Sequence, residues 1–125
     1  MTLLTPELHA RLLGNDRQRD VDHIPVVKFF NPLGAATWLA TELDEDGDTL
    51  FGLADLGFGC PELGAFSLTE MASVRLPLGL GIERDLWFEA TFPISVYAAA
   101  ARTAGRIVLD EDLLQAAADA IRETG

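Results

Sequence analysis

Four side chains that could form a reactive pocket lie in two short segments of the sequence. Asp55 and Cys60 belong to DLGFGCPELGAF, and Arg84 and Asp85 belong to IERDLWFE. If the two segments came together, a thiol, two carboxylates and a guanidinium could serve a small enzyme or a ligand-binding protein. Cys60 precedes a proline, which disfavours helical backbone at the cysteine. A small cysteine buried in a tight loop is therefore the stronger interpretation, and no catalytic residue is assigned.

Nucleophilic catalysis by Cys60 would require a neighbouring histidine, and the chain offers His9 and His23. His9 falls in an expected helix, and His23 lies in the acidic context VDHIP. Neither has a second nitrogen ligand near it in the sequence, and Cys60 is the chain's one cysteine. The sequence therefore predicts no disulfide, no metal site and no cofactor.

The glycines in the first segment raise the possibility of a phosphate-binding loop. Gly57, Gly59 and Gly64 are spaced between apolar residues, but no lysine follows them and Glu62 would repel a phosphate. The nearest following cation is Arg75. This segment is therefore expected to be a tight corner whose backbone lies close to the core.

The acidic run DEDGD resembles a calcium loop at first sight. An EF-hand counted from Asp44 would need glycine at its sixth position and glutamate at its twelfth, where this chain has Thr49 and Asp55. An Asp46-Gly47 pair between two strand-like runs is instead a strong signal for a β-hairpin. The run is expected to be a hairpin tip.

Charge is the most unusual property of the composition. The 125 residues contain 20 acidic and 9 basic side chains, which gives a net charge of −11. Direct nucleic-acid binding is not expected, because phosphate contacts need cations, whereas a basic protein surface would be attracted. Solubility alone is the alternative role for this charge. The expected binding surface comprises Asp44, Glu45, Asp46, Asp48, Glu83, Asp85 and Glu89.

Length and hydrophobicity indicate one globular domain. Hydrophobic residues make up 49% of the chain, and the longest apolar run, Ile94 to Ala101, is far shorter than the roughly twenty residues of a membrane span. The N-terminal residues lack the basic start and apolar core of a signal peptide. A cytoplasmic protein without membrane contact is expected.

The pattern of the chain predicts an α+β fold with a mainly antiparallel sheet of about four strands, arranged as a meander of hairpins, and with helices on one face. Alternation within TWLATEL would put Thr37, Leu39, Thr41 and Leu43 on one side of a strand. Strands are expected over residues 25–30, 37–43, 49–56 and 82–89. Helices are expected from Pro6 to about Gly14, over 68–75 after a Ser67 cap, after a Ser95 cap to Gly105, and after an Asp110 cap to the C-terminus.

The expected C-terminal helix has a single apolar stripe. This stripe could mediate a homodimer, which is a third interpretation of the chain's role. The stripe comprises Leu113, Leu114, Ala117, Ala118 and Ile121.

Several long blocks resemble a known family. PVVKFFNPLGAATWLATELD, FGLADLGFGCPELG, SLTEMASVRLPLGLGIERDLWFE and SVYAAAARTAGRI are similar to the bacterial family catalogued as domain of unknown function 2958 (DUF2958). The resemblance implies a family-like domain over residues 1–107 and a helical extension over 108–125. Trp87 stands where relatives commonly have histidine, which weakens an enzymatic interpretation, and the family provides no catalytic residues to transfer.

Members of that family occur largely on plasmids and integrative elements of proteobacteria, beside conjugation and anti-restriction genes. The resemblance therefore implies an accessory role on a mobile genetic element. Together with the charge, it favours a non-enzymatic, acidic interaction protein. One specific form would be an anti-restriction or anti-CRISPR factor that occupies a basic nucleic-acid-binding groove of a defence complex. The alternative is the enzyme or ligand-binding protein with a pocket near Asp55, Cys60, Arg84 and Asp85.

Overall fold

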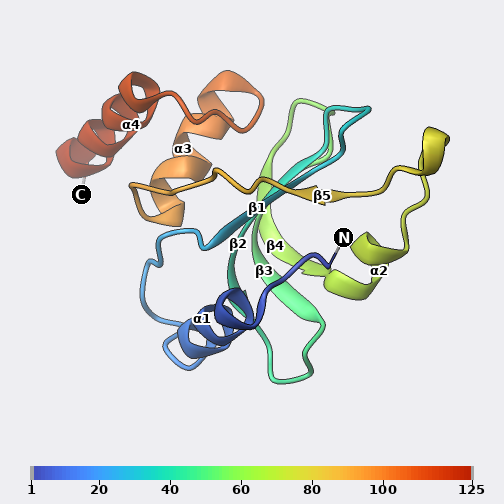
Figure 1. Cartoon of the computed structure of the whole chain (residues 1–125). Coiled ribbons are helices and arrows are strands. Elements are labelled where there is room, and N and C mark those ends of the chain that lie inside the picture. Colours follow the sequence, from blue (N-terminus) through green and yellow to red (C-terminus); the bar gives the residue numbers. More distant parts are fainter. Residues whose placement is uncertain (1, 125) are drawn as a thin grey trace.

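The computed structural model describes residues 2–124 and confirms the α+β class (Figure 1). Its five-stranded sheet has the order β4-β3-β2-β1-β5, and every pairing in it is antiparallel. The strands are β1 (Val27–Phe30), β2 (Thr37–Leu43), β3 (Thr49–Asp55), β4 (Glu62–Ser67) and β5 (Glu83–Arg84). The helices are α1 (Pro6–Asp16), α2 (Leu68–Ser73), the 3-10 turn η1 (Pro77–Gly79), α3 (Ile94–Ala104) and α4 (Glu111–Thr124).

Two of the predicted helix caps are present. Thr5 Oγ1 accepts a hydrogen bond from the Leu8 amide at 3.2 Å, and Ser67 Oγ accepts one from the Glu70 amide at 3.1 Å. Each bond satisfies an amide that the first helical turn leaves without a partner. The predicted Ser95 cap is wrong, because α3 begins at Ile94 and its N-cap is Pro93. The Ser95 amide and hydroxyl instead donate hydrogen bonds to the Asp22 carboxylate.

The strands at the two edges of the sheet differ most from the expectation. Part of the expected glycine-rich corner is β4, which pairs with β3 from Glu62 to Ser67 and was not predicted. Its weak signal has a physical reason, since an exposed edge strand lacks the clean alternation of a half-buried one. At the other edge, the strand predicted over 82–89 is two residues long, because the chain turns at Asp85. There the Asp85 carboxylate accepts the Trp87 amide at 2.9 Å.

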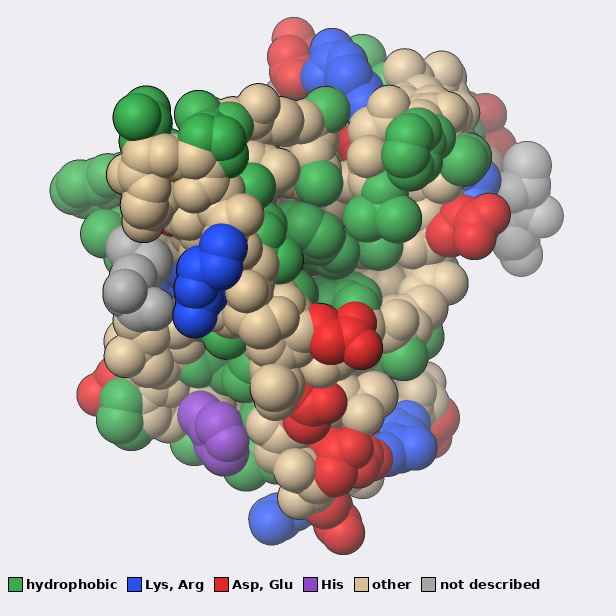
Figure 2. All heavy atoms as spheres, turned by 90° about the vertical axis from the view of Figure 1, so that its right-hand side faces the viewer, with side chains coloured by type: hydrophobic (Ala, Val, Ile, Leu, Met, Phe, Trp, Pro, Cys, Tyr) green, Lys and Arg blue, Asp and Glu red, His purple; other side chains and the backbone are tan. Residues whose placement is uncertain are grey.

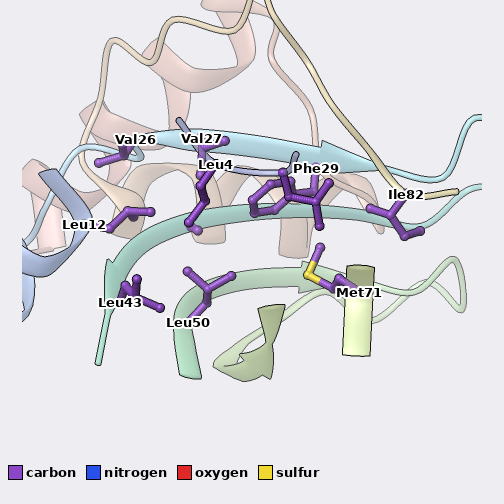
Figure 3. Packing of buried hydrophobic residues seen from close by; sticks show 11 residues of the cluster. Leu4, Leu12, Val26, Val27, Phe29, Leu43, Leu50, Met71 and Ile82 are labelled. Carbon is purple, nitrogen blue, oxygen red and sulfur yellow. The ribbon is translucent and has the colours of Figure 1, made fainter. Parts of the chain in front are cut away.

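The helices cover both faces of the sheet, not one face as expected. One buried cluster packs α1 and α2 against the first three strands, as Figure 3 shows for Leu12, Phe29, Leu50 and Met71. A second cluster packs α3 and α4 against Leu39 and its neighbours on the opposite face. Helices are needed on both sides because β2 and β3 carry apolar residues on both of their faces.

An irregularity in β2 decides which side chains reach each face. The register with β3 shifts between Ala40 and Glu42, so Thr41 is the extra residue of a β-bulge. Beyond the bulge, Leu43 pairs with Leu50 in the first cluster, whereas Leu39 lies in the second. The predicted common face of Leu39 and Leu43 is therefore wrong, because one inserted residue reverses the alternation.

Gly52 lies across from the bulge, where the backbones come unusually close. A Cβ at Gly52 would lie 1.9 Å from the Leu39 carbonyl oxygen, whereas a Cβ at Gly64, its partner on β4, would meet nothing within 4 Å.

Within the described chain, no helix has the length and hydrophobicity to cross a membrane.

Because of the close approach at Gly52, the variant Gly52→Ala should be destabilised by about 1–3 kcal/mol or more, since the added methyl group must displace backbone. Urea denaturation followed by circular dichroism measures this change. Gly64→Ala is the matched control and should stay within about 0.5 kcal/mol of the wild type. Equal midpoints for the two variants would contradict the close approach.

Candidate functional site

The structure does not bring Asp55, Cys60, Arg84 and Asp85 into one pocket. Asp55 ends β3 and Arg84 lies on β5, so β2 and β1 separate them in the sheet. Three strand spacings of about 4.8 Å put their backbones roughly 14 Å apart.

Cys60 is exposed in the loop before β4, so the predicted burial of this cysteine is wrong. The loop lies on the surface and not against the core, and Leu56 and Phe58 in it are exposed as well.

Asp55 has a structural role and connects two loops. Its buried carboxylate accepts the amide of Gly57 at 2.9 Å and the amide of Ile107 at 3.0 Å. The first bond shapes the loop after β3, and the second ties that loop to the chain leaving α3. Both oxygens of Asp55 are thus used as acceptors for backbone amides.

Arg84 and Asp85 also have structural partners. The Arg84 guanidinium donates to the carbonyl oxygens of Thr2 and Leu3, which fixes the N-terminal segment against β5. Asp85 pairs with Lys28 at 3.2 Å. Beside this pair, a surface depression of about 340 Å³ is also lined by Trp87, whose side chain is 93% exposed.

The predicted hairpin tip carries Asp44, Glu45, Asp46 and Asp48 between β2 and β3. Asp46 accepts bonds from the Asp48 amide and from the amide and hydroxyl of Thr49, at 2.7–2.8 Å. These bonds, those from Thr49 first, hold the pKa of the Asp46 carboxyl below its ordinary value. They keep the carboxylate ionised and fix it in one position.

Asp48 links the hairpin tip to the start of α2. Its carboxylate accepts the Thr69 amide at 2.7 Å and the Ser67 hydroxyl at 2.9 Å, and these bonds lower its pKa. Figure 2 shows acidic side chains gathered at the lower end of one face, which is the level of the hairpin tip in Figure 1.

Glu83 and Asp85 lie away from this tip, and Glu89 follows them in the chain after β5. Glu83 pairs with Phe30, which pairs with Thr37 at the far end of β2. At about 3.3 Å per residue, the length of β2 separates them by roughly 20 Å. The four hairpin carboxylates therefore do not share one surface with Glu83 and Asp85.

A groove beside the hairpin contains residues that sequence analysis missed. It has a volume of about 360 Å³ and lies on the sheet between the end of α1 and the hairpin. Its apolar floor includes Phe51, which is 39% exposed, and its walls carry three carboxylates. The lining residues are Asp16, Arg19, Glu42, Asp44, Thr49, Phe51 and Ala65.

Glu42 is the unusual member of the groove because it is only 8% exposed. Burial raises the pKa of its carboxyl above the ordinary value, against the opposing effects of His23 and of a bond from Thr41. The signal that could have found it is a single charged residue within the otherwise uncharged strand TWLATEL. Its face could not be predicted, because the bulge that sets it leaves no clear mark in the sequence.

The apolar stripe of α4 is largely used within the chain. Leu114 is buried, and Ala117 and Ala118 pack against the same cluster as α3. A homodimer through this helix remains a prediction and would have to use Leu113 and Ile121, which are 46% and 38% exposed.

The described residues contain no group of side chains that could hold a metal ion. Among residues 2–124, no three His, Cys, Asp or Glu side chains are grouped as a metal ion requires. The site is thus defined by fixed carboxylates beside an apolar groove on a small α+β scaffold.

Comparison with known proteins identifies the family. The chain belongs to the family described as Protein of unknown function (DUF2958), whose pattern matches residues 3–108. The matched region ends before α4. No curated protein and no solved structure matches the chain.

The bonded hairpin carboxylates make stability depend on pH in a defined direction. A carboxyl whose pKa is lowered on folding stabilises the native state above the ordinary aspartate value of 3.8, and this contribution is lost as pH falls through the folded value. The wild type should therefore lose more stability between pH 5 and pH 2.5 than Asp46→Asn does. Denaturation at each pH tests this, with Glu45→Gln as control, and parallel profiles for wild type and Asp46→Asn would contradict it.

The Asp55 carboxylate should matter for stability alone. Asp55→Ala leaves the partly buried amides of Gly57 and Ile107 without their acceptor and should cost about 1–3 kcal/mol. Chemical denaturation measures the loss. A cost below about 0.5 kcal/mol would contradict the structural role of Asp55.

Proposed function

We propose that the protein is a non-enzymatic interaction protein that binds a basic surface of another protein through the tip of the β2–β3 hairpin. The observation that carries this proposal is the fixed geometry of the hairpin carboxylates. Asp46 and Asp48 receive several short hydrogen bonds from backbone and hydroxyl groups. Their charges are thus held in place before any partner arrives.

Fixed charges favour binding because fewer side-chain rotamers are lost when the complex forms. The net charge of −11 adds long-range attraction toward a basic partner and repulsion from nucleic acid. A groove that normally binds phosphates presents arginines and lysines, which carboxylates can occupy in place of phosphates. This proposal extends to an anti-restriction or anti-CRISPR factor in the cytoplasm, acting for the mobile element that the family resemblance implies.

The dispersion of the other candidate residues gives the enzyme interpretation little support. Asp55, Arg84 and Asp85 each use their charge on a structural partner, and Cys60 lies apart from them. We therefore propose binding as the activity of this chain.

The proposal predicts salt-dependent capture of a nucleic-acid-handling protein from bacterial lysate, and competition by duplex DNA. Neutralising the tip with Asp44→Asn, Glu45→Gln, Asp46→Asn and Asp48→Asn should reduce capture about tenfold or more, since four exposed pairs at roughly 0.3–1 kcal/mol each give that factor. Quantitative mass spectrometry of the captured proteins at low and high salt measures the effect.

The matched control neutralises four carboxylates elsewhere: Glu83, Glu89, Asp112 and Glu123. This control should retain most of the capture, because local and not total charge is proposed to act. Equal loss in both variants, or capture that salt and DNA leave unchanged, would refute the proposal.

A further inference from the structure

We propose that the groove between α1 and the β2–β3 hairpin binds the guanidinium group of one arginine of the basic partner, with the Glu42 carboxylate as its principal acceptor. This inference rests on the proposed function and deepens it. It assigns a specific pocket to an interaction that the hairpin tip would otherwise make by charge alone.

The charge of Glu42 is only partly compensated within the chain. In the described structure, its one hydrogen bond comes from Thr41 Oγ1 at 3.3 Å, and the ion pairs there do not include it. The same hydroxyl lies 3.2 Å from the Phe51 carbonyl oxygen, and its single hydrogen must serve both acceptors. Glu42 as a residue is 8% exposed, and burial is the largest cause of the raised pKa of its carboxyl, so a cation in direct contact would stabilise the charged form.

The β-bulge at Thr41 directs the Glu42 side chain into the groove. With regular alternation, Glu42 would share the face of Ala40 and point into the first core cluster. The bulge at Thr41 turns it to the face of Phe51, with which it pairs, and sends Leu43 into the core. Bulges that redirect a side chain are frequent beside functional sites.

The groove matches a guanidinium group in its charge, its apolar surface and its volume. The planar guanidinium offers five donors, which suits several carboxylates converging from different directions. Asp16 and Asp44 flank Glu42, and the ring of Phe51 supplies a surface for stacking. The volume of about 360 Å³ lies at the lower end of the range for ligand pockets, which fits one side chain and not a large ligand.

Arg19 makes no ion pair with Glu42, although its charge, like that of His23, acts to lower the pKa of the Glu42 carboxyl. Arg19 Nη2 pairs with Asp16 at 3.0 Å and with Asp44 at 2.8 Å, while 66% of its side chain remains exposed. Arg19 thus lies at the rim and links the two outer carboxylates. The inner carboxylate is left for a cation that enters from outside.

The groove should bind more weakly in acid. The charged residues that line it are Asp16 from α1, Arg19 from the following loop, Asp44 from the hairpin and Glu42 itself, and His23 acts on Glu42 through its charge. Lowering the pH protonates Glu42 and removes the charge that would hold a bound cation. A raised pKa at Glu42 starts this loss at a higher pH than an ordinary glutamate would.

The test uses L-argininamide as the probe and the full chain labelled with ¹⁵N and ¹³C. Titration at pH 7 should shift the signals of the Glu42 carboxyl and the Phe51 ring in a saturable manner, with L-lysinamide binding more weakly. Glu42→Gln should weaken argininamide binding about tenfold, whereas Glu123→Gln, on α4 and outside the groove, should leave it unchanged. Phe51→Leu, which keeps an apolar floor, provides a second variant and should weaken binding if Glu42→Gln fails to fold.

Three results would overturn the inference. These are no saturable shift at Glu42 or Phe51, equal binding by Glu42→Gln and wild type, or binding that appears only in Arg19→Ala, which would mean that Arg19 fills the groove in solution. The outcomes for the proposed function are separate. Salt-sensitive capture through the hairpin with no argininamide binding refutes the groove alone, and argininamide binding without such capture refutes the hairpin function alone.

Discussion

The β-bulge at Thr41 is the constraint on which the rest of the structure depends. One inserted residue sends Leu43 into the core beneath α1 and turns Glu42 to the opposite face of the sheet. The bulge needs Gly52 across from it, because any side chain there would meet the Leu39 carbonyl oxygen. Core packing, the groove and the approach to the hairpin tip therefore share a single backbone feature.

The acidic side chains of this protein have two distinct roles. Asp55 and Asp48 are acceptors for backbone amides and connect loops to helices. Glu42 has no comparable set of donors, although it is almost fully buried. Some acidic side chains thus stabilise the fold, whereas the Glu42 carboxylate can accept further hydrogen bonds from a partner.

Sequence analysis was successful where the signal is local. The Thr5 and Ser67 caps and the hairpin at Asp46-Gly47 each depend on a few adjacent residues, and the structure contains all three. It was unsuccessful where the outcome depends on distant partners. Strand β4 forms only because β3 offers an edge, and the bulge exists only because Gly52 admits a close carbonyl. The groove follows from that bulge, so Glu42 was absent from the predicted binding set.

The central claim is that the fold buries a carboxylate at Glu42 and leaves it ready for an external cation. The most direct measurement is the pKa of the Glu42 carboxyl, followed by ¹³C NMR with and without argininamide. The account predicts a pKa above 4.5 in the free protein, the ordinary value for glutamate, and a fall in that pKa when the cation binds. A pKa at or below 4.5 in the free protein, unmoved by argininamide, would contradict it.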